Sequence, residues 1–237
     1  MYLSQLLVNM GSDPAKPRPG LAWIKQTYRV HQRIWMAFPD DSRRAEDPFF
    51  LGQWANDAKA KPQRSTGGFL FRIEQDHPTR ILVQSLLKPD WEYAFQNAPY
   101  LLTEPPKVRQ FEPELSVGER YRFRLVMLMV RRRSRKHRQA DPKVPLEVPI
   151  RCDDAQLTAW RDRLREVSAA HGLEAHDLVV QPNRSLRMKD GAASFNAAAF
   201  DGMLKCVDAE RLRSAVINGV GRGKAFGMGL LSLAVPK

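Results

Sequence analysis

The order of the predicted secondary-structure elements is the feature that most constrains how this chain can fold. In the first half, apolar periodicity predicts a buried strand over residues 2–9, a helix over 21–38 and a weaker helix near 91–96. Two short strands, 69–74 and 80–87, lie between the helices. The order is strand–helix–strand–strand–helix, with a gap in the following proline-rich stretch, where a closing strand belongs.

The second half predicts the same order. Residues 120–130 begin as an alternating strand, with Tyr121 and Phe123 facing one way and Arg122 and Arg124 the other. The remaining predicted elements are a helix over 154–170, strands over 177–188, 193–200 and 203–207, a helix over 209–217 and a last strand near the end of the sequence.

Each half therefore predicts, with gaps, the βαββαβ order that ferredoxin-like folds and RNA-recognition modules share. We expect an α+β protein of two tandem ferredoxin-like (RRM-like) domains, residues 1–115 and 116–237. The length of 237 residues suits one large or two small domains, and 43% hydrophobic residues provide for a core.

The charge balance predicts a polyanionic partner. Lys and Arg number 38 against 26 Asp and Glu, which gives a formal net charge of +12. Such a surplus suits nucleic acid first and an anionic membrane second. No run approaches the ~18 consecutive apolar residues that span a bilayer, and the first residues have no basic start typical of a secretory signal.

The cysteines and histidines predict neither disulfides nor a metal. Cys152 and Cys206 have no paired spacing, which favours a reducing, cytoplasmic location. The five histidines form no ligand pattern with one another or with the cysteines. We expect no metal site, no cofactor and no membrane partner.

The densest positive charge lies in residues 131–138. Between Glu119 and Asp141 there are nine Lys or Arg and no acid. A charge run of this kind is often only a solvated loop, but this one follows a strand that already carries outward arginines. The sequence predicts that its cations contact phosphate: Arg131, Arg132, Arg133, Arg135, Lys136 and Arg138.

The helix predicted over 21–38 carries two residues suited to acid–base chemistry. Its apolar stripe consists of Trp23, Thr27, Val30, Ile34 and Phe38. Tyr28 and His31 are three residues apart and lie about 160° and about 100° from Val30, so both turn away from the stripe.

Histidine accepts or donates a proton near neutral pH. Beside RNA, such a group can promote attack of the ribose 2′-OH on the adjacent phosphate without a metal. Arg29 and Arg33 flank the pair and are candidate phosphate contacts. The alternative is a surface Tyr–His pair at an interface.

The last nineteen residues form a glycine-rich segment that ends in an apolar run. Five glycines alternate with Arg222 and Lys224, so the backbone can approach a phosphate closely while two cations supply charge. A P-loop is excluded because Asn218 and Ala225 occupy positions that need Gly and Ser or Thr, and the dinucleotide-binding glycine spacing also fails. The alternative is a flexible turn before a final strand.

These motifs in combination resemble the CasE family. They are the opening Met-Tyr-Leu-Ser strand, Tyr28-x-x-His31 followed by Trp35 and Phe38-Pro39, the strand from Tyr121 to Leu125, and the ending that begins Gly219-x-Gly-x-Gly-Lys. CasE proteins are the CRISPR repeat-processing endoribonucleases of the type I-E Cascade complex, and the resemblance runs from end to end.

The resemblance implies metal-independent cleavage at the 3′ base of a repeat hairpin, leaving a 5′-hydroxyl and a 2′,3′-cyclic or 3′ phosphate. It implies three kinds of partner: the CRISPR repeat RNA hairpin, the mature guide RNA and other Cascade subunits. By position, His31 is the catalytic histidine and Tyr28 its companion. The segment that faces RNA comprises Gly219, Gly221, Arg222, Gly223 and Lys224.

Some members of the family have a lysine about five residues after the histidine, where this chain has Met36. Arg33 could supply that charge, so the third catalytic role stays open, as does the choice between acid and base for His31. The excursion at 40–67 is longer than the family needs. Two other functions fit the basic surfaces: a non-catalytic RNA-binding assembly subunit, and a protein drawn to anionic lipid.

The charge pattern predicts a steep salt dependence of RNA binding. Each neutralised phosphate lowers the logarithm of the affinity by about 0.7–0.9 per tenfold rise in salt. A salt titration of repeat-hairpin binding, followed by fluorescence anisotropy, should therefore show a slope of several units. A flat response would contradict the nucleic-acid interpretation.

Overall fold

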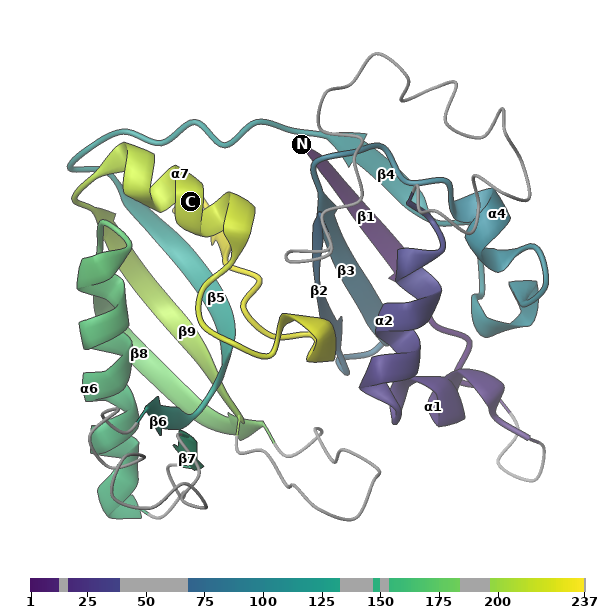
Figure 1. Ribbon diagram of the computed structural model, residues 1–237, viewed down its shortest axis with the longest axis horizontal. Helices are drawn as coiled ribbons and strands as arrows, with labels where there is room; N and C mark the ends of the chain where they lie inside the picture. Colours follow the sequence, from purple (N-terminus) through teal and green to yellow (C-terminus); the bar gives the residue numbers. More distant parts are fainter. Residues whose placement is uncertain (13–16, 39–67, 133–146, 150–153, 184–196, 237) are drawn as a thin grey trace, which may run out of the picture. The chain divides into compact units, whose positions relative to one another are not determined.

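A computed structural model describes residues 1–12, 17–38, 68–132, 147–149, 154–183 and 197–236. It divides into two compact units (Figure 1). Unit 1 comprises Met1–Glu114 and Lys224–Leu230, and unit 2 comprises Leu115–Gly223 and Leu231–Lys237. The sequence placed all of 116–237 in one domain, whereas residues 224–230 pack with the first unit.

Unit 1 is built on a four-stranded antiparallel sheet with the strand order β2-β3-β1-β4. The strands are β1 (Tyr2–Leu7), β2 (Phe69–Glu74), β3 (Arg80–Ser85) and β4 (Lys107–Gln110). The helices are α1 (Pro19–Ile24), α2 (Thr27–Trp35), α4 (Trp91–Phe95) and the short 3-10 helix η2 (Pro99–Leu101). This order is that of the ferredoxin-like fold.

The helix predicted over 21–38 is in fact two helices. The chain leaves helical geometry at Gln26, whose φ is −113° and ψ 77°, and the Gln26 N–H bonds to the Trp23 carbonyl at 3.0 Å. No Gly or Pro marks this break, so residue type alone could not predict it. The predicted apolar stripe nevertheless holds across both helices, since all five of its residues are buried.

The core of unit 1 lies between α2 and the sheet. Val30 and Ile34 have no exposed surface and pack in one cluster with Phe69 and Phe71 of β2. Trp91 of α4 closes another part of the cluster, and its Nε1–H donates to Ser4 Oγ at 3.0 Å. The predicted apolar stripe of the helix thus packs against the face of β2 that carries Phe69 and Phe71.

The closing strand missing from the sequence pattern is β4. It pairs with β1 through the register from Tyr2↔Gln110 to Gln5↔Lys107, and its four residues are all exposed. A short strand with no buried face has no apolar alternation, which is why periodicity could not find it.

Unit 2 repeats the topology with the strand order β10-β5-β9-β8. The strands are β5 (Arg120–Leu128), β8 (Leu173–Asn183), β9 (Ala197–Cys206) and β10 (Ser232–Ala234), and the helices are α6 (Asp154–Ala170) and α7 (Ala209–Asn218). Figure 1 shows α6 running alongside β8. Two short strands, β6 (Val130–Arg132) and β7 (Glu147–Pro149), form a separate antiparallel pair. The predicted α+β class and tandem ferredoxin-like architecture are confirmed.

Three strand predictions in unit 2 were wrong in their bounds. The strand predicted from 177 begins at Leu173, and those predicted at 193–200 and 203–207 are the single strand β9. Gly202 lies inside β9, between the two predicted strands, and allows a close approach of β8. A Cβ there would lie 2.7 Å from the His176 carbonyl oxygen, where β8 has its register irregularity. Glycine in a strand often marks such a bulge in the neighbouring strand.

No helix among the described residues is long and apolar enough to cross a membrane.

The packing of α1 generates a stability prediction. A Cβ on Gly20 would lie 2.1 Å from the Asn9 carbonyl oxygen, so Gly20→Ala must displace the helix. Overpacking of this kind costs about 1–3 kcal/mol of unfolding free energy, to be measured by urea denaturation. The matched control is Ala22→Ser on the exposed side of α1. Its unfolding free energy should stay within about 0.5 kcal/mol of the wild-type value. Equal effects of the two substitutions would contradict the described contact.

Candidate functional site

Tyr28 and His31 lie on the outward side of α2, as their helical positions predicted. The Tyr28 side chain is 53% exposed, and His31 is half-buried. Their rings are stacked, with centroids 6.0 Å apart. The helix therefore presents a phenol and an imidazole together.

The His31 imidazole packs against aromatic rings of β2 and α2. Its centroid lies 5.1 Å from the Phe69 ring, to which it is stacked, 6.2 Å from Phe71 and 5.9 Å from Trp35. Phe69 and Phe71 share one face of β2 because side chains alternate along a strand. The histidine thus lies at the rim of the core rather than inside it.

Burial against these rings determines the protonation of His31. Desolvation lowers the pKa of the imidazole below its ordinary value of 6.5, because a charged ring is disfavoured beside apolar surface. At neutral pH the ring is therefore mostly neutral and carries one nitrogen that accepts a proton. Nδ1 is buried and has no hydrogen-bond partner within the described part of the chain. Nε2 is thus the nitrogen left for a substrate.

The end of the glycine-rich segment completes this site. Lys224–Phe226 form the short 3-10 helix η3, which packs against α2 and β2. The Phe226 ring lies 6.1 Å from the Tyr28 ring. A Cβ on Gly227 would come within 3.1 Å of the Phe71 ring. Residues more than 150 positions apart in the sequence thus meet beside Tyr28 and Phe71, which both lie next to the histidine ring.

Lys224 is the cation that this turn contributes. Its side chain is half-buried, and desolvation lowers the pKa of its ammonium group. A partly buried cation interacts more strongly with a phosphate than one in open solvent, because water screens it less. Since η3 packs on α2, the helix that carries His31, Lys224 is a further candidate for the open third role.

Arg33 is directed elsewhere. It donates from Nη1 to the Ala94 carbonyl oxygen at 3.0 Å, which ties α2 to α4. Met36, at the position where some relatives have lysine, is half-buried. Arg29 is exposed on α2 and stays a candidate phosphate contact.

The first part of the glycine-rich segment belongs to unit 2 and needs its glycines. Gly219, Gly221 and Gly223 have φ values of 73°, 76° and 84°, a region that favours glycine. Gly219 ends α7, with its N–H bonded to the Ala215 carbonyl at 2.8 Å. Arg222 between them is exposed. The residue types thus satisfy a backbone requirement, which is separate from any contact with RNA.

The basic run is described only at its start. Arg131 and Arg132 lie in β6, with the backbone of Arg131 opposite Val148 and that of Arg132 opposite Glu147. Four of the predicted cations lie outside the described residues: Arg133, Arg135, Lys136 and Arg138. The whole 40–67 excursion also lies outside them.

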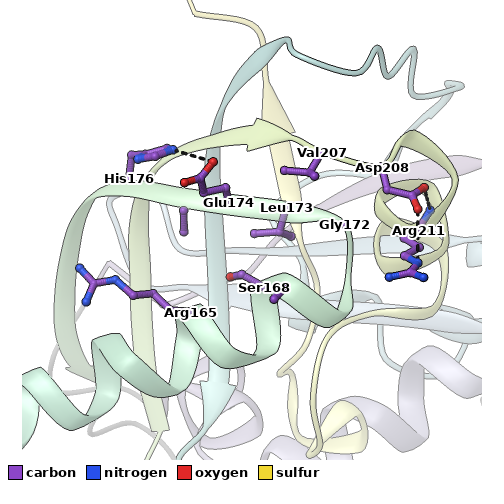
Figure 2. A pocket seen from close by; sticks show the side chains of 11 residues that line it. Arg165, Ser168, Gly172, Leu173, Glu174, His176, Val207, Asp208 and Arg211 are labelled. Carbon is purple, nitrogen blue, oxygen red and sulfur yellow. Dashed lines mark hydrogen bonds and ion pairs between the residues drawn. The ribbon is translucent and has the colours of Figure 1, made fainter.

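A cavity of about 740 Å³ in unit 2 contains none of the predicted site residues. Figure 2 shows Arg165 and Ser168 of α6 beside it, near His176 and Glu174, whose Nε2 and Oε2 atoms are 3.7 Å apart. No group of three or more His, Cys, Asp and Glu able to hold a metal occurs among the residues that the structure describes.

Comparison with known proteins identifies the family. A family model described as CRISPR associated protein matches residues 1–235. The chain belongs to this family. The recognition of a CasE protein from sequence motifs is confirmed.

Two curated relatives of this CasE-family chain cover almost its whole length. The CRISPR-associated endoribonuclease Cse3 of Thermus thermophilus is 33% identical over 99% of this chain and 100% of its own. The Cascade subunit CasE of Escherichia coli is 26% identical over 99% of both chains. A solved structure of Thermus thermophilus Cse3, bound to an RNA representing a pre-cleavage complex, superposes with a TM-score of 0.67 at 26% identity and 98% coverage of both chains.

The lowered pKa of His31 predicts how the CasE-family chain responds to acid. As the pH falls toward and below ~6.5, the unfolded chain binds a proton at this histidine more readily than the folded chain does. The free energy of unfolding therefore falls with the pH. Urea denaturation at successive pH values should show a smaller fall in His31→Gln. The control, His77→Gln at an exposed position, should keep the wild-type pH dependence. An unchanged pH dependence in His31→Gln would contradict the burial effect.

Proposed function

We propose that this chain is a metal-independent endoribonuclease that cleaves CRISPR precursor RNA at the 3′ base of the repeat hairpin. The single observation that carries the proposal is the neutral, half-buried His31 beside Tyr28 and the Lys224 turn. Relatives named as a CRISPR endoribonuclease and as a Cascade subunit match the chain over nearly its full length, which supports the substrate class.

In the proposed reaction His31 is the general base. Its lowered pKa favours this role, since the neutral ring predominates at neutral pH. Nε2 removes the proton of the 2′-OH, and the 2′ oxygen attacks the adjacent phosphorus. The bond to the 5′ oxygen breaks, and that oxygen takes a proton from solvent. The products are a 2′,3′-cyclic phosphate and a 5′-hydroxyl.

Two further residues stabilise the charge that develops on the phosphate. In this proposal the half-buried ammonium of Lys224 attracts the non-bridging oxygens, and the hydroxyl of exposed Tyr28 donates a hydrogen bond to one of them. The nucleophile comes from the RNA itself, and these side chains supply a base and a cation. The proposed chemistry therefore requires no metal.

The remaining basic residues hold the RNA in this proposal. The cations of the 131–138 run contact the phosphates of the repeat hairpin, as does exposed Arg29. Gly219, Gly221, Gly223 and Arg222 offer backbone and charge to the RNA. After cleavage the protein keeps the mature guide RNA and joins other Cascade subunits, as the name of the Escherichia coli relative suggests.

The second candidate is a non-catalytic RNA-binding assembly subunit that uses the same surfaces. The relative named as a Cascade subunit is what favours it. It predicts tight hairpin binding with no product over hours.

The deciding prediction concerns His31→Ala. General acid–base catalysis by one histidine typically contributes about 10²–10⁴-fold, so the single-turnover cleavage rate of the repeat hairpin should fall by that factor while the dissociation constant stays within about threefold. The control is Gln32→Ala, an exposed neighbour on α2, which should cleave at the wild-type rate. Gel separation of 5′-labelled RNA measures the cleavage rate and the dissociation constant.

Two additions complete this experiment. Cleavage should persist in EDTA, and a 2′-deoxy nucleotide at the cut site should abolish it, because the nucleophile is then missing. Full activity of His31→Ala, or activity lost to EDTA, would refute the proposed mechanism. Binding without any product in the wild-type protein would support the assembly subunit instead.

A further inference from the structure

Residues 224–230, here called the C-terminal strap, pass from one face of β2 to the other. β2 is an edge strand, since β3 is its only partner in the sheet order of the described strands. On the face that carries Phe69 and Phe71, the strap places Phe226 beside Tyr28 and Gly227 against Phe71. Its last residue, Leu230, is bound by Arg72, which points to the opposite face.

Arg72 anchors the end of the strap from a buried position. Its Nη1 donates to the Leu230 carbonyl oxygen at 3.2 Å, and the residue is only 4% exposed. Nη2 and Nε donate to Glu74 Oε1 at 2.8 and 3.3 Å. The planar guanidinium is thus fixed in orientation by the carboxylate while it holds the strap.

Glu74 is kept ionised in this network. Burial alone would raise the pKa of its carboxyl group, but the hydrogen bonds from Arg72 and Arg80 outweigh burial and lower the pKa. Arg80 Nε donates to Oε2 at 2.7 Å, and its side chain is 36% exposed. The buried charge of Arg72 is therefore balanced at neutral pH.

A buried ion pair is a weak source of stability, because desolvation offsets most of its attraction, and apolar residues of similar volume often serve as well. The strap, in contrast, needs a directional contact. Gly227 and Gly229 have φ values of 79° and 83°, so this backbone has wide conformational freedom before it is held. Met228 and Leu230 of the strap are buried, but apolar contacts of this kind are less directional than a hydrogen bond.

We propose that Arg72 is a positioning residue for RNA cleavage: by holding the Leu230 carbonyl, it fixes the strap so that Lys224 and Phe226 stay against the His31 site. This inference rests on the proposed function for its effect on cleavage. The anchoring of the strap itself does not.

The test is the double variant Arg72→Met with Glu74→Gln, which removes the bond to Leu230 and leaves no unpaired buried charge. Hydrogen exchange of the peptide covering 224–230 should become at least about tenfold faster, and the Gly227 N–H, which bonds to the Lys224 carbonyl at 3.2 Å, is a reporter within it. Single-turnover cleavage should fall about tenfold with the dissociation constant of the hairpin unchanged.

Two further variants separate positioning from general structural support. If Arg72 acts through the strap, the double variant should lose little more activity when Lys224→Ala is added, because coupled residues are non-additive. Arg80→Gln removes another partner of Glu74 but leaves the bond between Arg72 and Leu230, and should keep wild-type strap exchange and cleavage.

Unchanged strap exchange in the double variant would overturn the anchoring. Faster strap exchange with wild-type cleavage, while His31→Ala is inactive, would overturn the positioning role. So would faster exchange throughout unit 1, because that indicates general unfolding. If instead His31→Ala cleaves normally, the proposed function fails, and strap exchange still decides whether Arg72 anchors the strap.

Discussion

The packing of α2 on β2 is the interaction on which the rest of the structure depends. Val30 and Ile34 are fully buried in the cluster that contains Phe69 and Phe71. Because a helix and a strand each have a defined periodicity, this contact also decides which α2 residues stay outside. His31 is left at the rim, where the phenylalanines lower its pKa without enclosing it. A structural contact thereby sets the electrostatic environment of a neighbouring residue.

The sequence predicted well what depends on apolar periodicity. It predicted both ferredoxin-like halves, the stripe on α2 and the outward positions of Tyr28 and His31. It failed where periodicity is absent, as in the fully exposed β4, or where geometry depends on distant backbone, as at Gly202 beside the irregularity of β8. The break at Gln26 has no residue type that signals it.

The candidate site was predicted in parts but not as an assembly. The motifs identified His31, Tyr28 and Lys224 separately, yet nothing in the linear pattern showed that residues 224–230 pack with unit 1. Arg33 was the natural choice for an added cation because it lies close in sequence, but its guanidinium is bonded to Ala94. Arg72 was missed because an arginine within an apolar strand resembles an exposed position. Only the contacts with Glu74 and Leu230 show that it is buried.

The discontinuity of unit 1 has a consequence for biosynthesis. A ribosome releases the chain from the N-terminus, and domains generally fold as they emerge. The sheet and helices of unit 1 can form early, but the residues of the strap are made only after almost all of unit 2. A nascent or truncated chain would carry His31 without the turn that completes its surroundings. The surroundings of His31 are thus completed only after residues 224–230 have been translated.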